Sequence, residues 1–178
     1  EKNYLQCPDL DAADKMEKKI KAVKKKGDSL GGIVEIIASN VPPGLGDPVF
    51  DKLDADIAKA MMSIGAVKAV EIGAGIRAPK MTGFENNDQI LPDGFQTNHS
   101  GGILAGISSG DDIIARVHVK PIPSILKSQQ TIDEKGGSTE ISTKGRHDIC
   151  AIPRINKVCE AMLAIVLTDH LLRQKILD

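Results

Sequence analysis

The first helical pattern in the sequence lies between residues 11 and 26. Met16, Ile20 and Val23 recur there at spacings of three and four residues among many lysines, and Gly27 follows. Residues at this spacing share one face of an α-helix, and glycine is common just after a helix ends. The pattern therefore predicts an amphipathic helix whose lysine-rich face is exposed to solvent.

Two further stretches have the same periodicity. In residues 50–64 the apolar face would consist of Phe50, Leu53, Ile57, Ala60, Met61 and Ile64. From residue 153 to near the C-terminus it would consist of Ile155, Val158, Met162, Ile165, Val166 and Leu172. Each stretch predicts a helix of several turns that packs one face against a core.

Three segments indicate β-strands. Residues 31–41 form a β-branched run closed by two prolines and a glycine, and residues 113–119 alternate before Pro121. Residues 67–72 also alternate, but both of their faces are partly apolar. Alternation is typical of a strand with one buried face, whereas a strand that is apolar on both faces is typical of the centre of a sheet. We therefore predict three strands, with residues 67–72 in a central position.

Turn-forming residues fill the segments between these elements. Residues 78–94 are polar and rich in turn signals, and residues 97–110 (TNHSGGILAGISSG) contain four glycines. Strand-compatible residues flank residues 134–137, which predicts a β-hairpin with its tip at that position.

The composition narrows the class of protein. The chain has 178 residues, of which 41% are hydrophobic, and this is enough for the core of one domain. Lys and Arg number 23 against 24 Asp and Glu, so the net charge of -1 gives no electrostatic reason to expect nucleic acid or an anionic membrane as a partner. No run of about 18 apolar residues and no signal-peptide pattern occurs. We expect a single soluble domain in the cytoplasm.

The three cysteines, Cys7, Cys150 and Cys159, are an odd number without metal-ligand spacing. This argues against a disulfide framework or a zinc site, and Cys150 and Cys159 are interpreted as small buried hydrophobes. Aromatic residues make up 2% of the chain, so a bound ring system would have to lie on aliphatic and backbone surfaces. No metal is expected.

Three segments carry candidate chemistry: residues 97–110, KPIPS at residues 120–124 and GRHD at residues 145–148. Glycines allow backbone N–H groups to approach a phosphate or a ring closely, although a tight structural turn has the same composition. Lys120 and Ser124 would present an ammonium and a hydroxyl from a proline-stiffened loop, which suits a phosphate. The alternative is a strand-capping lysine followed by an ordinary proline turn.

Arg146, His147 and Asp148 place an anion donor, an imidazole and a carboxylate side by side. If this segment is extended, Arg146 and Asp148 share a face while His147 turns to the other. Arg146 and Asp148 would then be the functional pair. A surface ion network is the alternative interpretation.

Five stretches, read in order, resemble successive motifs of the chorismate synthase family. They are GDPVFDKLDADIAKAMMSIGAVKAVEIGAG, GFQTNHSGGILAGISSG, KPIPS, KGRHDICAIPR and EAMLAIVLTDHLLRQ. The resemblance covers nearly the whole chain. It implies an α+β fold with helices sandwiched between antiparallel β-sheets, in an enzyme that assembles as a homotetramer. Glu1 matches roughly the middle of a family member, so residues 1–178 are expected to be the C-terminal portion, without the N-terminal half.

The resemblance also implies contacts with FMN. The positions that match the family's flavin contacts are Gly65, Ala66, Ala105, Lys120, Pro121, Ile122, Pro123, Ser124 and Arg146. Many family members have Asn where this chain has Gly65, so a backbone contact is expected to survive there while a side-chain contact is not.

The family reaction is an anti 1,4-elimination that removes phosphate and a proton from 5-enolpyruvylshikimate 3-phosphate and gives chorismate, in aromatic amino-acid biosynthesis. Reduced FMN transiently donates an electron and emerges unchanged. The resemblance implies catalytic roles for Arg146, as an anion clamp, and for Asp148, as a carboxylate that assists proton movement. The family's two catalytic histidines belong to its N-terminal half, so we expect this chain alone to be inactive. A non-catalytic FMN- or phosphate-binding module and a structural oligomerisation module are the alternatives.

Overall fold

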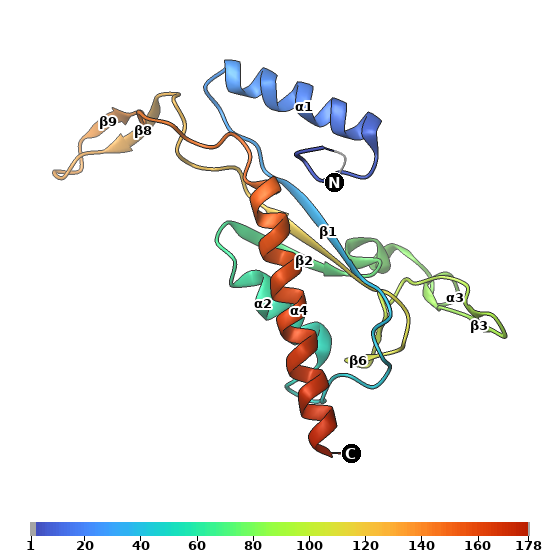
Figure 1. The fold of residues 1–178 in the computed structure, drawn as a ribbon. Coiled ribbons are helices and arrows are strands. Elements are labelled where there is room, and N and C mark those ends of the chain that lie inside the picture. The colour runs from blue at the N-terminus through green and yellow to red at the C-terminus, as the bar shows by residue number, and fades with distance from the viewer. Residues whose placement is uncertain (1–2, 178) are drawn as a thin grey trace. The chain divides into compact units, whose positions relative to one another are not determined.

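The computed structural model describes residues 3–177, which fold into two compact units. The first unit contains the residues up to Gly32 together with Val119–Ile155. The second contains Ile33–His118 together with the residues from Asn156 onward. Figure 1 shows the chain as a ribbon and labels elements from both units. The prediction of one domain for the whole chain stays a prediction.

A sheet of three strands forms the centre of the second unit, in the order β1-β7-β2. The bounds are Gly32–Ala38 for β1, Ile113–Val119 for β7 and Val67–Ile72 for β2. Alternate side chains of β7 are buried, and those of Ile113, Ala115 and Val117 are fully inaccessible. The alternation predicted for residues 113–119 is therefore confirmed.

Strand β2 lies at an edge of this sheet, so the central position predicted for residues 67–72 is wrong. Of its residues only Val67 is buried. The order of strands depends on pairing between segments that are far apart in the sequence, and the hydropathy of one segment does not encode it.

Helix α2, Leu53–Met62, packs against β2. Leu53, Ile57 and Met61 are fully buried, as the helical spacing predicts. Phe50 is different: it is 91% exposed, so placing it on the apolar face is wrong. The chain turns before the helix begins, because Asp47 and Asp51 exchange backbone hydrogen bonds of 2.9 and 3.0 Å, and Phe50 lies inside this turn.

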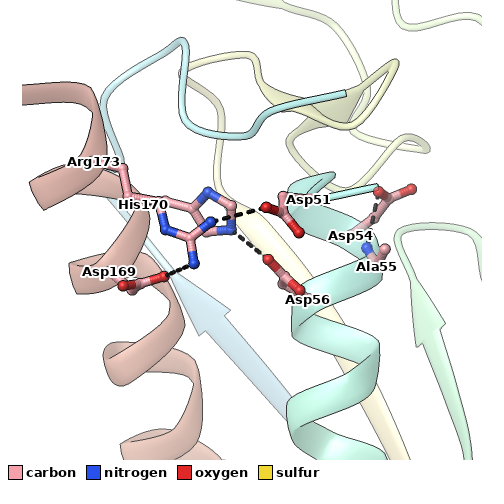
Figure 2. Close-up of polar contacts among 7 residues, drawn as sticks. All are labelled: Asp51, Asp54, Ala55, Asp56, Asp169, His170 and Arg173. Carbon is pink, nitrogen blue, oxygen red and sulfur yellow. Dashed lines mark hydrogen bonds and ion pairs between the residues drawn. The ribbon is translucent and has the colours of Figure 1, made fainter. Parts of the chain in front are cut away.

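Helix α4, Ile152–Leu177, contributes its residues from Asn156 onward to the second unit. The predicted helix is confirmed, but Val158, Ile165 and Leu172 are exposed, so placing them on a buried apolar face is wrong. Its buried His170 is 3% exposed, with Nε2 3.1 Å from Asp56 Oδ2 on α2. One turn later, Arg173 forms ion pairs with Asp51 at 3.1 Å and Asp169 at 2.7 Å (Figure 2). A polar contact thus joins α2 and α4 beside the apolar core.

The chain between β2 and β7 forms short elements. They are η1, Gly75–Lys80; α3, Gly83–Asn86; the antiparallel pair β3, Ile90–Leu91, and β4, Gly94–Phe95; and the antiparallel pair β5, Ile103–Leu104, and β6, Ile107–Ser108. The segment predicted to be turn-rich therefore contains two short helices and one hairpin, while the glycine-rich segment contains another.

Ionisable side chains lie on the less buried face of the sheet. Glu35 Oε2 accepts from Arg116 Nε at 2.7 Å, and His118 pairs with Glu71. The pKa of Glu71 is lowered, mainly by the hydrogen bond from the Ile76 N–H and further by His118.

The first unit contains helix α1, Leu10–Lys25, and the antiparallel hairpin of β8, Gln129–Ile132, and β9, Ser138–Ile141. Asp9 caps α1 by accepting a hydrogen bond of 3.0 Å from the Ala12 N–H. The helix predicted over residues 11–26 and the hairpin predicted around residues 134–137 are both confirmed.

Cys159 is fully buried, and burial raises the pKa of its thiol. Its interpretation as a small hydrophobe is confirmed, whereas Cys150 is only half-buried. Helices and antiparallel strand pairs occur together along the chain, which confirms the α+β class.

Candidate functional site

A cavity of about 560 Å³ lies in the first unit beside the GRHD segment. Helix α1, the turn at residues 27–29, residues 124–126 and residues 145–150 line it. Isoleucines from these segments form apolar parts of the wall, and Lys24, Ser124 and Arg146 are polar parts. This volume falls within the range of about 300–1,000 Å³ that is typical of small-molecule sites.

The KPIPS segment is fixed against the turn that precedes β1. The Ser29 hydroxyl donates a hydrogen bond of 2.6 Å to the Ile122 C=O. Gly31 lies so close to this segment that a Cβ at its position would be 2.3 Å from the Val119 oxygen. Ser124 lines the cavity, while Lys120 is exposed at the start of the segment. The expected phosphate contacts of these two residues are untested.

Asp148 is held by two guanidinium groups. Its Oδ2 lies 2.7 Å from Arg154, and its Oδ1 lies 3.6 Å from Arg146. Arg146 and Asp148 therefore share a face, as predicted, but Arg154 is the closer partner. The residue pattern did not indicate Arg154, because its pairing with Asp148 depends on where the fold places the start of α4.

The Arg146 side chain is 85% exposed, and its ion-pair partner within residues 3–177 is Asp148, at 3.6 Å. An exposed ion pair of this kind contributes little to stability, so it can be exchanged for a ligand. Because Arg154 already balances the Asp148 carboxylate, the Arg146 guanidinium can bind an anion at the cavity mouth without leaving that carboxylate unpaired.

His147 lines the same cavity as Arg146 and Asp148, which corrects the prediction that it turns to the opposite side. Residues 145–148 are not part of a strand, so the alternation of strand side chains does not apply. Its Nε2 atom is buried and has no hydrogen-bond partner within residues 3–177. A buried polar atom without a partner is uncommon, and a bound ligand is one explanation.

The negative charge of Asp28, which also lines the cavity, is partly neutralised. Asp28 accepts from Lys127 Nζ at 2.6 Å, and this hydrogen bond is the main reason that the pKa of Asp28 is lowered. With Asp28 paired in this way, Lys24 and Arg146 are cations available to an anionic ligand at this cavity.

The second unit holds the other expected flavin contacts, at the two ends of α2. Gly65 and Ala66 follow the helix, whereas the Gly106 C=O beside Ala105 accepts a hydrogen bond of 2.8 Å from Leu53 N–H at its start. A helix of 10 residues is about 15 Å long. A single ligand would have to extend along α2 to contact both groups.

Both alanines have left-handed backbone conformations, with φ of 75° at Ala66 and 53° at Ala105. Residues other than glycine rarely adopt such angles, and strained positions of this kind concentrate at binding sites. Ala105 and Gly106 form the two-residue turn of the β5–β6 hairpin. The positive φ angles of Ala66 and Ala105 were not indicated by the sequence pattern.

Comparison with known proteins identifies the family. The family model described as chorismate synthase matches residues 1–172. The chain belongs to the chorismate synthase family. It is 64% identical over 175 residues to a chorismate synthase of Desulfosudis oleivorans, covering 98% of this chain and 49% of that relative. It is also 64% identical over 173 residues to a chorismate synthase of Desulfatibacillum aliphaticivorans, covering 97% of this chain and 48% of the relative.

A solved structure agrees with this assignment. A crystal structure of chorismate synthase superimposes with a TM-score of 0.73 at 39% identity, over 90% of this chain and 43% of the other. The family resemblance and the fold class expected from it are thereby confirmed. This chain spans about half the length of the curated relatives it matches.

The positions expected to contact flavin in the chorismate synthase family are divided between the two units. Residues 120–124 and Arg146 belong to the first unit, and Gly65, Ala66 and Ala105 to the second. Within the first unit, Ser124, Arg146 and Asp148 line one cavity. Their roles toward FMN stay predictions.

Proposed function

We propose that the protein containing this chain converts 5-enolpyruvylshikimate 3-phosphate into chorismate with reduced FMN as cofactor. The observation that carries this proposal is the group formed by Arg146, Asp148 and Arg154 at a ligand-sized cavity, in a chain that belongs to the chorismate synthase family. The activity of the whole protein is proposed, because the chain spans about half the length of its relatives.

The cavity is compatible with a ligand that has both an aromatic ring system and a phosphate. Ile20, Ile125 and Ile149 offer aliphatic surface for a ring, in a chain whose aromatic content is 2%. Lys24 and Arg146 offer positive charge for the phosphate. The residues present therefore fit FMN.

In the proposed 1,4-elimination the substrate loses phosphate and a proton from carbons at the two ends of an existing C=C bond. The electron pair of the C–H bond forms one new double bond, the existing double bond shifts toward the carbon that loses phosphate, and a conjugated pair of double bonds results without net oxidation. Bound reduced FMN would supply a transient electron. Arg146 would bind an anionic group and orient it. Asp148 would move a proton, and its pairing with Arg154 would hold the carboxylate in place for that transfer.

A second candidate is a non-catalytic module that binds FMN or phosphate, and a third is a structural oligomerisation module. The exposed Arg146 and the cavity favour binding over a purely structural role. Titration with FMN distinguishes the candidates: binding without turnover supports the module, and absence of both supports the structural role.

We further propose a cytoplasmic enzyme that forms a homotetramer and requires neither nucleic acid nor a membrane. Within residues 3–177, no helix combines the length and hydropathy needed to cross a bilayer. The family resemblance supports the tetramer.

Two substitutions in the complete natural protein test the catalytic roles. Asp148→Asn keeps the shape of the side chain but cannot accept a proton as a carboxylate does, so kcat should fall by about 100-fold or more with little change in FMN affinity. Arg146→Ala removes the anion clamp, so affinity for substrate and FMN should fall together with the rate.

Asp93→Asn is the matched control for Asp148→Asn, and Arg77→Ala is the matched control for Arg146→Ala. Both control residues are exposed and lie outside the cavity. Steady-state kinetics with chorismate detection would separate kcat from KM. If the two variants lose only binding and reach parental rates at saturating ligand, Asp148 is a structural partner of the arginines and has no catalytic role.

A further inference from the structure

Asp88 lies between α3 and β3, outside every helix and strand. Its Oδ1 accepts hydrogen bonds from the Thr97 hydroxyl and the His99 N–H, each at 2.7 Å. Its Oδ2 accepts from the Ser100 N–H at 2.8 Å and the Ser100 hydroxyl at 2.7 Å. One half-buried carboxylate therefore binds donors from Thr97, His99 and Ser100.

These bonds require a charged carboxylate. Burial alone would raise the pKa of Asp88, but the hydrogen bonds from Ser100 and His99 outweigh it and lower the pKa to about 2. Hydrogen bonds to an ionised acceptor are stronger than those between neutral groups. Each carboxylate oxygen also accepts from one backbone N–H, so either orientation of an Asn amide would point its NH₂ group at a backbone N–H.

The segment that Asp88 holds is itself tied to the sheet. The His99 C=O accepts from the Ala74 N–H at 2.7 Å, directly after β2. Asn98 donates to the Asp112 C=O and accepts from the Gly102 N–H, both at 2.7 Å.

Gly101 and Gly73 allow the backbone of residues 98–102 to approach the end of β2 closely. A Cβ added at Gly101 would lie 2.4 Å from the Gly73 nitrogen, which only a pair of glycines can accommodate. Residues 98–102 therefore have one position relative to the end of β2 and the start of β7.

The β5–β6 hairpin follows this segment directly. Ile103 is buried, and at the hairpin turn the Gly106 C=O accepts a hydrogen bond of 2.8 Å from the Leu53 N–H. The Ser108 hydroxyl donates to the Pro42 C=O and accepts from the Leu45 N–H, at 2.7 and 2.8 Å. Backbone hydrogen bonds and buried side chains thus fix the chain on both sides of Ala105, from the residues that Asp88 binds to Ser108.

We propose that Asp88 is a positioning residue for the expected flavin contact of the second unit: its carboxylate holds residues 97–102 and, through them, sets the position of Ala105. This inference rests on the proposed function, because Ala105 is an expected FMN contact. Asp88 itself touches no expected ligand. Its effect is transmitted by the backbone, and a displacement of about 1 Å can lower the rate or affinity of a site by about 100-fold.

The test is an equilibrium titration of the complete natural protein with FMN, for the parent and for Asp88→Asn. Asp93→Asn is the matched control, since Asp93 is an exposed aspartate in the β3–β4 turn of the same excursion. We expect the dissociation constant to rise about ten-fold or more in Asp88→Asn and to stay parental in Asp93→Asn. Hydrogen–deuterium exchange should rise at residues 97–106 in the first variant only.

Ser100→Ala is a milder variant that removes one hydroxyl donor and leaves the Ser100 backbone bond in place. It should raise the dissociation constant in the same direction by a smaller factor, and it decides the question if Asp88→Asn does not fold. The inference is overturned if Asp88→Asn folds and binds FMN with parental affinity, even if its thermal stability is lower. If Asp88→Asn does not fold, parental affinity in Ser100→Ala overturns it instead. Failure of the parent to bind FMN would instead contradict the proposed function, so the two failures are distinguishable.

Discussion

The contact between Asp56 and His170 can be tested by removing the carboxylate with Asp56→Ala. His170 is 3% exposed and Asp56 is 20% exposed, so the imidazole depends on this partner for a hydrogen bond that water cannot readily replace (Figure 2). A buried polar group left without its partner costs about 1–3 kcal/mol. Asp56 also lies in the first turn of α2, where an acidic side chain stabilises the helix dipole by about 0.3–1 kcal/mol.

These two contributions predict a loss of about 2–3 kcal/mol in the free energy of unfolding. For a domain of about 150–250 residues, each kcal/mol lowers Tm by about 2–4 °C, so a decrease of about 5–10 °C is expected for the transition that unfolds α2 and α4. Thermal and urea unfolding of the natural protein, followed by circular dichroism, would measure it.

Asp54→Ala is the matched control, because Asp54 lies in the same first turn but makes its side-chain bonds to Ala55 and Lys52. It should lose the dipole contribution and these two exposed contacts, which contribute little. Asp56→Asn should fall between the two, since an amide oxygen can still accept from the imidazole. Equal losses for Asp56→Ala and Asp54→Ala would refute the role assigned to the buried contact.

Three further outcomes are expected. Lys120→Ala should weaken FMN binding at least several-fold, because it removes a charge-assisted contact; an unchanged dissociation constant in equilibrium titration, with Lys80→Ala as control, would make Lys120 an ordinary surface lysine. Ala105→Gly should stabilise the protein by about 1 kcal/mol, since glycine adopts the φ of 53° without strain; a lower Tm would contradict this. The pKa of Asp88 is lowered from 3.8 to about 2, so its carboxylate contributes stability that is complete above about pH 4 and is lost as the pH falls toward 2. The stability difference between parent and Asp88→Asn should therefore narrow over this window in acid titrations, and a difference that stays constant would contradict the assignment.

Local periodicity predicted most of the elements. The buried positions Leu53, Ile57 and Met61 and the alternation of β7 follow from spacing that each segment carries within itself. The edge position of β2 did not follow, because the order of strands is decided by partners that are distant in the sequence.

The candidate site was predictable to a similar extent. The residue types in GRHD indicated Arg146 and Asp148, and these two do share the wall of a cavity. Arg154 and Asp88 were missed because their roles depend on which backbone and charge the fold places opposite them. The left-handed conformations of Ala66 and Ala105 were not predictable either, since alanine is not a residue that signals a positive φ.

The central claim is that this chain contributes to a reaction that depends on reduced FMN. The measurement that tests it most directly is formation of chorismate from 5-enolpyruvylshikimate 3-phosphate by the natural protein, under anaerobic conditions, with and without reduced FMN. We predict turnover only when reduced FMN is present, and loss of that turnover in Asp148→Asn. Undiminished turnover in the absence of flavin would contradict the claim.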